Sequence, residues 1–320
     1  TNAIPIRISV HHGIDSFQLH ATHVYRLTKG NFFAYKEFLN YKTEFFKLSK
    51  IQQSAGIEEA RKRIDMRFSG EVGVDMNYSK KSAFGDSFDY RLIRESDKIK
   101  ILVAPHCFYD SPHPFGINLY PDVSDWLENL IEISKKTDYD WYVKTHPDFL
   151  DSTKEMVEKV FKDHPKFTIL PSDSSHLQIV DEGIDFALTM YGSIGFEYAA
   201  MNIPVINASL NNPHIAFDFN IHPKTQKEYM NILMDLKAVN HKINKTDVYR
   251  YYYMNKLHLS LEWLFLDRTK VLTDLGGYHG QFRPEMYQYW VENWTIENHQ
   301  TILSGLRNFI DSGEYLYYPD

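Results

Sequence analysis

Two short segments in the middle of this 320-residue chain carry side chains that can bind phosphate. Residues 141–147 have the sequence Trp-Tyr-Val-Lys-Thr-His-Pro, in which Lys144 and His146 follow an apolar run typical of a strand. Residues 186–197 have the sequence Phe-Ala-Leu-Thr-Met-Tyr-Gly-Ser-Ile-Gly-Phe-Glu, which predicts a strand, a glycine turn and the start of a helix. A basic pair at one strand end and a glycine–serine helix start at another predict a phosphate site in an α/β sheet.

Each residue type in the two segments has a chemical role in such a site. The His146 imidazole, held extended by the proline that follows it, can donate to a phosphate oxygen, and the Lys144 ammonium can balance the charge. Gly192 lets the backbone approach an anion, and Ser193 can either cap the helix or bind phosphate. Glu197, one turn further along the helix, can accept hydrogen bonds from two ribose hydroxyls. These five residues form the predicted nucleotide site.

The elements that must position these residues are strands and helices in alternation over residues 98–245. Strands are predicted near 99–105, 141–144, 167–170, 186–190 and 205–208, and helices near 123–136, 152–162, 175–182, 193–201 and 224–236. Such alternation predicts an α/β fold with a Rossmann-like, doubly wound parallel sheet and helices on both faces. Ligands of such sheets bind at the carboxyl ends of the strands, where both segments lie.

Two further segments flank this Rossmann-like domain of residues 98–245, which carries the predicted nucleotide site. Residues 1–97 predict a strand over 4–10 and helices over 33–66, and are too short for a complete Rossmann domain. We therefore expect a smaller or incomplete N-terminal domain on the acceptor side. Residues 246–320 are helical in pattern and rich in aromatic side chains, and we expect them to cross back to the first domain.

The two motifs also resemble those of a known family. A Lys-x-His-Pro and a Gly-Ser-x-Gly-Phe-Glu, each after its own strand and in this order, resemble the histidine–proline and serine motifs of bacterial capsule polysaccharide transferases. That group has the GT-B fold and includes Kdo-transferase-like enzymes; polysialyltransferases and teichoic-acid glycerophosphotransferases carry related motif pairs. The resemblance covers about residues 98–240. It implies a GT-B glycosyltransferase that takes a CMP-, UDP- or CDP-linked sugar, with the matching residues holding phosphate and ribose, and a surface polysaccharide or glycolipid as acceptor.

Candidates for acid–base chemistry lie in the loop after the first strand of this domain. Asp110 and His113 could serve the acceptor hydroxyl, and His106 could bind the sugar or the acceptor. The same cluster could instead hold a metal, because several ligand types lie close together, or be a structural loop. Enzymes of the GT-B type usually act without a metal, and no Asp-x-Asp strand end is present, so we expect neither a metal nor a cofactor.

Three other places in the chain offer polar side chains for the acceptor half of the reaction. His12 belongs to a polar N-terminal cluster, and Glu71 and Asp75 lie in a glycine-bounded loop where a carboxylate could act as base or nucleophile. Asn212 and His214 follow the predicted strand that ends near residue 208, and could hold sugar hydroxyls. The stereochemistry of transfer, inverting or retaining, stays open.

Composition limits the partners and the compartment. The net charge is −7, which argues against a broad nucleic-acid surface, and the single cysteine, Cys107, excludes a disulfide within the chain. Neither a signal peptide nor an apolar run of about 18 residues is present. We therefore expect a cytoplasmic protein, with peripheral contact to the inner membrane possible through the aromatic C-terminal helices. The chain does not begin with Met, and we expect that an N-terminal domain can be missing from it.

Four functions fit these features. The first is a glycosyltransferase of surface polysaccharide assembly. The second is a CDP-alcohol glycerophosphotransferase, although the strongly basic membrane-binding helices expected of one are lacking. The third is a nucleotide-sugar epimerase, in which two carboxylates and a histidine act in one closed cleft. The fourth is a non-catalytic subunit that binds a nucleotide-sugar.

Overall fold

The computed structural model describes residues 3–20, 22–31, 36–77, 79–105, 108, 118–148, 151–259, 262 and 266–318. The chain forms two compact units, one from Thr1–Ala34 with His258–Asp320 and one from Tyr35–Leu257. In chain order the elements are α1 (Ala3–His11), β1 (Ser16–Leu19), β2 (Val24–Leu27), η1 (Glu37–Asn40), α2 (Tyr41–Lys47), α3 (Lys50–Phe68), β3 (Lys100–Val103), α4 (Val123–Lys136), β4 (Asp140–Val143), α5 (Asp151–Phe161), β5 (Phe167–Ile169), α6 (His176–Asp181), β6 (Phe186–Thr189), α7 (Ile194–Ala200), β7 (Val205–Asn207), α8 (Gln226–Met234), η2 (Leu236–Ala238), α9 (Lys245–Tyr252), η3 (Tyr253–Leu257), α10 (Arg268–Asp274), η4 (Tyr278–Phe282), α11 (Pro284–Asn293), α12 (Gln300–Ser312) and β8 (Leu316–Tyr317).

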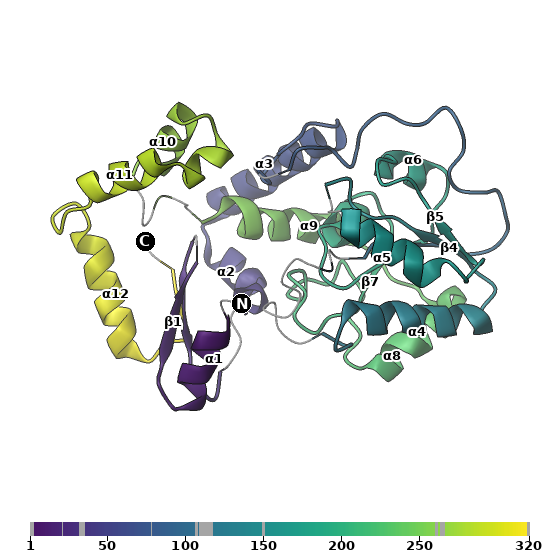
Figure 1. Ribbon diagram of the computed structural model, residues 1–320, viewed down its shortest axis with the longest axis horizontal. Coiled ribbons are helices and arrows are strands. Elements are labelled where there is room, and N and C mark those ends of the chain that lie inside the picture. The colour runs from purple at the N-terminus through teal and green to yellow at the C-terminus, as the bar shows by residue number, and fades with distance from the viewer. Residues whose placement is uncertain are drawn as a thin grey trace. The chain divides into compact units, whose positions relative to one another are not determined.

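The larger unit is built on a five-stranded parallel sheet (Figure 1). The strands lie in the order β5-β4-β3-β6-β7, and every neighbouring pair is parallel. From β3 the chain moves outward through β4 and β5 on one side, and then returns to add β6 and β7 on the other side. This is the doubly wound order of Rossmann-like sheets. The predicted α/β class and all five predicted strands of this sheet are confirmed, with strand ends within a few residues of the expected ones.

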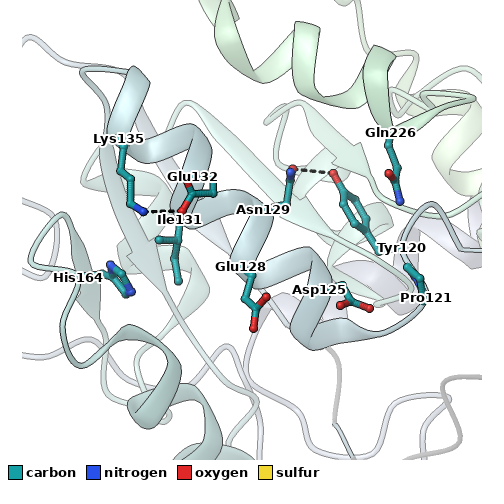
Figure 2. A pocket seen from close by; sticks show the side chains of 10 residues that line it. All are labelled: Tyr120, Pro121, Asp125, Glu128, Asn129, Ile131, Glu132, Lys135, His164 and Gln226. Atoms are coloured by element: carbon teal, nitrogen blue, oxygen red, sulfur yellow. Dashed lines mark hydrogen bonds and ion pairs between the residues drawn. The ribbon is translucent and has the colours of Figure 1, made fainter.

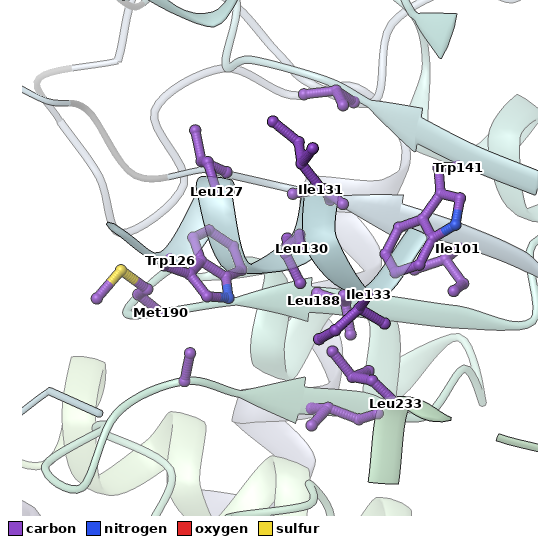
Figure 3. Packing of buried hydrophobic residues seen from close by; sticks show 14 of the residues in the cluster. Ile101, Trp126, Leu127, Leu130, Ile131, Ile133, Trp141, Leu188, Met190 and Leu233 are labelled. Carbon is purple, nitrogen blue, oxygen red and sulfur yellow. The ribbon is translucent and has the colours of Figure 1, made fainter. Parts of the chain in front are cut away.

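Helices cover both faces of the sheet because alternate strand residues point to opposite sides. Ile101 and Val103 of β3 join the apolar cluster under α4, α5 and α8, part of which Figure 3 shows. Leu102, between them, points to the other face, where it packs with residues of α6 and α7. A strand that is buried on both sides has a continuous apolar sequence, which is what residues 101–103 have.

Helix α4 illustrates how local signals set the element boundaries. The Asp122 side chain accepts from the Ser124 amide at 3.0 Å and so caps the helix, and two lysines end it at Lys136. The buried indole of Trp126 donates to the Tyr229 hydroxyl of α8 at 2.9 Å, which satisfies a polar atom inside the apolar cluster. Helix α4 spans the residues predicted from the sequence.

A third apolar cluster joins α2, α3 and α9 to α7. Phe45 of α2 and Ile64 of α3 are fully buried with Phe196 of α7 and Tyr252 of α9. Residues 35–97 and 246–257 therefore belong to the same compact unit as the sheet. The domain boundaries predicted at 97/98 and 245/246 both fall inside this unit.

The smaller unit combines the two ends of the chain. Strands β1, β2 and β8 form an antiparallel sheet, and Phe309 of α12 packs against Val24 of β2. The prediction of a strand over residues 4–10 is wrong, because these residues form helix α1. Apolar residues at every second position also satisfy the i, i+4 spacing of a helix, and Ile6 and Val10 take the less exposed positions. The helices expected over 246–320 are confirmed as α9 to α12, whereas strand β8 was not expected.

Candidate nucleotide site

The sheet order reverses between β3 and β6, and the candidate site lies at the carboxyl ends of the strands there. The loop after β4 begins at Lys144, whose amide donates to the Val103 carbonyl of β3 at 3.1 Å. The loop after β6 contains Gly192 and Ser193 and leads into α7. The two motifs predicted from the sequence thus follow β4 and β6, the two strands that flank β3, at the same end of the sheet.

The Lys144 ammonium is turned into the protein rather than into solvent. Its side chain is buried, and Nζ donates to the Ser172 carbonyl at 3.1 Å and to the Thr145 carbonyl at 3.4 Å. Burial lowers the pKa of Lys144 to about 8, against the attraction of Glu197 and Asp173, which raises it. Lys144 is therefore a fixed positive charge beneath the site, able to act on a ligand mainly through its field.

One hydrogen bond defines the tautomer of the His146 ring. The Asp148 amide donates to His146 Nδ1 at 3.1 Å, so the neutral ring carries its proton on Nε2. Burial lowers the pKa of His146, while the nearby Glu197 raises it and Lys144 lowers it further. A neutral imidazole with a proton on Nε2 is a hydrogen-bond donor toward a phosphate oxygen at neutral pH.

Asp148 was not predicted as part of the site, yet it organises the loop around His146. Its carboxylate accepts from the amides of Lys80 and Lys81, at 3.0 and 3.3 Å, while its own amide holds the imidazole. One residue thus ties the segment after α3 to the loop after β4. An acidic residue directly after a His-Pro pair is the only sequence signal for this role, and it is weak.

The Gly192–Ser193 turn leaves backbone amides available. The N–H groups of Gly192, Ser193 and Ile194 donate to none of the residues that the structure describes. A Cβ at position 192 would lie 3.0 Å from the Thr189 hydroxyl, which is one reason for glycine there. Successive free amides in a turn form a concavity suited to an anion. Helix α7 has only seven residues, so this binding capacity comes from the turn more than from a helix dipole.

Ser193 does not cap α7 with its side chain, one of the two roles considered for it. Its backbone is helical, and its hydroxyl donates instead to Glu197 Oε2 at 3.3 Å. The other carboxylate oxygen of Glu197 accepts from the guanidinium of Arg67, in the last turn of α3. Glu197 is 4% exposed, and its carboxylate is the common neighbour of Lys144, His146 and Arg67.

Arg67 was missed from the sequence, because nothing near it suggests phosphate chemistry. Its guanidinium bonds the Val74 carbonyl at 3.0 Å as well as Glu197, and lies 5.6 Å from the centre of the Phe196 ring. These contacts connect α3 with α7 and with the loop that follows α3. A carboxylate that is held by Arg67 and Ser193 still has lone pairs for ribose hydroxyls, because each oxygen can accept two hydrogen bonds.

Several other predicted residues have structural positions. Asp75 forms a two-point ion pair with Arg63, accepts from the Tyr252 hydroxyl at 2.7 Å and has a left-handed backbone conformation. An engaged carboxylate of this kind is unsuited to act as a free base. Glu71 is exposed in the loop after α3, and His12 is exposed in the smaller unit. Within the larger unit, none of the described contacts of Asp75 or Glu71 is with Lys144, His146 or Glu197.

The residues after β7 are buried, and Asn212 supports the loop that follows β6. The Asn212 amide donates to the Met190 carbonyl at 3.2 Å and to Asn207 at 3.1 Å. His214 is 1% exposed and packs against Tyr251, with ring centres 4.5 Å apart. Both were predicted to contact the sugar or acceptor, but in the structure both face the interior. His106, Asp110 and His113 lie outside the described residues.

A separate cavity of about 550 Å³ lies over the outer side of α4 (Figure 2). It shares no residue with the site, and its lining is Tyr120, Pro121, Asp125, Glu128, Asn129, Ile131, Glu132, Lys135, His164 and Gln226. Figure 2 shows the carboxylates of Asp125 and Glu128 projecting from α4. A lining with three carboxylates disfavours a phosphate, so we do not place the nucleotide there.

Comparisons with known proteins return no family for this chain. The sequence matches no protein-family model and no curated protein. Among solved structures, similar chains include Thermosulfurimonas dismutans KpsC, a beta Kdo 2,4 transferase, with 12% identity, a TM-score of 0.44, and coverage of 72% of this chain and 65% of that one. This chain thus spans less than two thirds of that structure's length.

Two further solved structures show similarity at the same low level. S. aureus MnaA in a co-structure with UDP has 14% identity and a TM-score of 0.32, with coverage of 55% of this chain and 46% of that one. The wall teichoic acid polymerase TagF has 15% identity and a TM-score of 0.30, with coverage of 62% and 45%. Likenesses of this order do not establish a shared activity, so the case for function depends on the residues of the site. Within the described part of the chain, no helix is both long and apolar enough to cross a membrane.

Proposed function

We propose that this chain is a glycosyltransferase of the GT-B type that takes a sugar from a nucleotide-activated donor. The observation that supports this most is the arrangement around Glu197 at the switch point of the sheet. Glu197 interacts electrostatically with the buried cation of Lys144 and with the His146 imidazole, and its helix begins at the Gly192–Ser193 turn, whose amides donate to no residue in the described part of the chain. Together they provide positive charge, hydrogen-bond donors and an acceptor for hydroxyls, which are the groups that a nucleotide requires.

Each part of a nucleotide has a matching group. The phosphate oxygens would accept from His146 and from the turn amides, with the Lys144 charge beneath them. The ribose hydroxyls would donate to Glu197, whose carboxylate Arg67 and Ser193 hold in place. The base and the sugar would lie further out from the strand ends. The donor's nucleotide, CMP, UDP or CDP, is a matter for experiment.

In the proposed reaction an acceptor hydroxyl attacks the anomeric carbon of the donor sugar. The bond from that carbon to the phosphate oxygen breaks, and its electron pair stays on the leaving nucleotide. The negative charge that develops there is stabilised by the donors already aimed at the phosphate, which is the larger part of the catalysis. A base takes the acceptor proton, and Asp110 and His113 remain the candidates for it. We propose a surface polysaccharide or glycolipid as acceptor, on the resemblance of the two motifs.

The test is nucleotide binding by the full chain, measured as thermal shifts with CMP, CDP, UDP, GDP and ADP. We expect one nucleotide to raise the melting temperature, and His146→Ala to abolish that increase. The matched control is His164→Ala, because His164 precedes β5 and so lies at the opposite end of the strands. If no nucleotide stabilises the chain, the proposal is wrong. Binding without donor hydrolysis or transfer would instead favour the non-catalytic subunit.

A further inference from the structure

One lysine close to this site has no described partner. Lys256 lies on η3, a π-helical turn that continues α9. Its side chain is half-buried, and its ammonium makes no hydrogen bond or ion pair with any residue in the described part of the chain. Single π-helical turns are rare and occur frequently at functional sites. A half-buried cation without a partner in such a turn requires an explanation.

The turn that carries Lys256 is fixed by its neighbours. The hydroxyl of Tyr252, the last residue of α9, donates to Asp75 at 2.7 Å, and the Asn255 amide in the turn donates to the Tyr41 hydroxyl at 3.3 Å. The Tyr253 ring lies so close to Gly56 of α3 that a Cβ there would be 2.8 Å away. The π-helical turn is thus held from several sides, and the position of Lys256 is set by packing.

The charges around Lys256 leave it without a carboxylate of its own. Glu197, Asp75 and Arg67 are its electrostatic neighbours, and burial lowers its pKa. Asp75 is already paired with Arg63, and Glu197 with Arg67. Both carboxylates are therefore neutralised by arginines, and Lys256 is a surplus positive charge. Partly burying an unpaired cation costs free energy unless an anion completes the pair.

We propose that Lys256 is a second cation of the nucleotide site and binds a phosphate oxygen of the ligand. This inference rests on the proposed function. Hydrogen bonds connect the turn to Glu197: the Tyr252 hydroxyl donates to Asp75, and Arg67 donates both to the neighbouring Val74 carbonyl and to Glu197. Glu197 also attracts both Lys144 and Lys256 electrostatically. Lys144 donates to backbone carbonyls, whereas the Lys256 ammonium donates to no residue that the structure describes and could form charge-assisted bonds to a ligand. Lys256 would thus contact the phosphate directly, whereas Lys144 would act on it mainly through its charge.

The experiment compares Lys256→Met, which keeps the length of the side chain and removes its charge, with Lys256→Arg. The matched control is Lys245→Met, because Lys245 is an exposed lysine at the start of the same helix α9. Affinity for the nucleotide that stabilises the wild type is measured by titration calorimetry at low and high salt. We expect Lys256→Met to weaken binding about tenfold or more and to reduce its salt dependence, and Lys256→Arg to retain most of it.

The results distinguish this inference from the function on which it rests. If the wild type binds no nucleotide, both are wrong. If the wild type and Lys256→Met bind equally while His146→Ala does not bind, the nucleotide site stands and the role of Lys256 is wrong. A merely structural lysine would lower the melting temperature without ligand when replaced. We expect that temperature to stay the same or rise in Lys256→Met, because the surplus charge is gone. If Lys256→Met does not fold, loss of affinity in a folded Lys256→Gln supports the inference and full affinity overturns it.

Discussion

Replacing Lys144 by methionine separates the binding role of this residue from its effect on folding. Burial brings its pKa from the ordinary 10.5 to about 8, a difference that corresponds to about 3 kcal/mol. The wild type therefore bears a cost of this order at neutral pH for keeping the ammonium in its interior. Methionine removes the charge but leaves the Ser172 and Thr145 carbonyls without their donor, which costs about 1–3 kcal/mol. The two terms nearly cancel, so we expect Lys144→Met to be about as stable as the wild type.

The pH dependence of stability gives a sharper measurement, because pH changes the cost of the buried Lys144 charge but not the cost of carbonyls left without a donor. Below about pH 8 the folded and unfolded states both hold the proton on Lys144, and the folded state bears the full cost. Between pH 8 and 10.5 the unfolded state binds more protons, so stability rises with pH and the cost is relieved. Denaturant unfolding at pH 7 and pH 10 should show the wild type gaining up to about 3 kcal/mol relative to Lys144→Met.

Nucleotide affinity should also depend on the protonation of Lys144, but it should fall with rising pH where stability rises. A phosphate near Lys144 favours its charged form, so nucleotide affinity should fall as pH rises above about 8. Titration calorimetry in buffers of different ionisation enthalpy would detect the proton taken up. Lys136→Met, which removes an exposed lysine at the end of α4, is the control and should change neither property. Equal affinity in Lys144→Met and wild type, with no difference in their pH profiles, would refute the reasoning.

Three further changes test other contacts of the site. Gly195→Ala should destabilise the fold by about 1–3 kcal/mol in denaturant unfolding, because the new Cβ would lie 2.3 Å from the buried His214 ring. Arg67→Met should cost about 3–5 kcal/mol by leaving the Glu197 carboxylate buried and unpaired, and adding Glu197→Gln should recover part of that loss; no recovery would contradict the pairing. Because burial lowers the pKa of His146, wild-type nucleotide affinity should not fall between pH 6.5 and 7.5, as it would if the imidazolium were the binding form.

The sheet could be predicted from the sequence because its signals are local. Each strand of residues 98–245 is a short apolar run bounded by helix caps or turns, and the strands alternate with amphipathic helices such as α4. Lys144, His146 and Ser193 could be placed at one sheet edge for the same reason, since parallel strands end on the same side. The prediction for residues 4–10 was wrong because their alternating apolar residues fit both a strand and a helix, and tertiary packing decides between the two.

The parts of the site that the sequence did not indicate depend on contacts between distant helices. Arg67 meets Glu197 across 130 positions of sequence, through the apolar cluster that packs α3 and α9 on α7. No local pattern reports such a contact. The burial of His214 and Asn212 was also not predictable, because polar residues in a loop after a strand usually face solvent and here hold the loop from within.

The distribution of charge explains why the site needs Arg67, which is distant in sequence, as well as the residues of the two motifs. The motif residues supply donors for an anion, but an anion beside the buried Glu197 would be repelled unless that carboxylate were neutralised. Arg67 provides this neutralisation, and it reaches Glu197 only when α3 packs against α7 through their shared apolar cluster. Helix α3 is therefore as much part of the nucleotide site as the strand ends are, although it lies outside the stretch that carries the motifs.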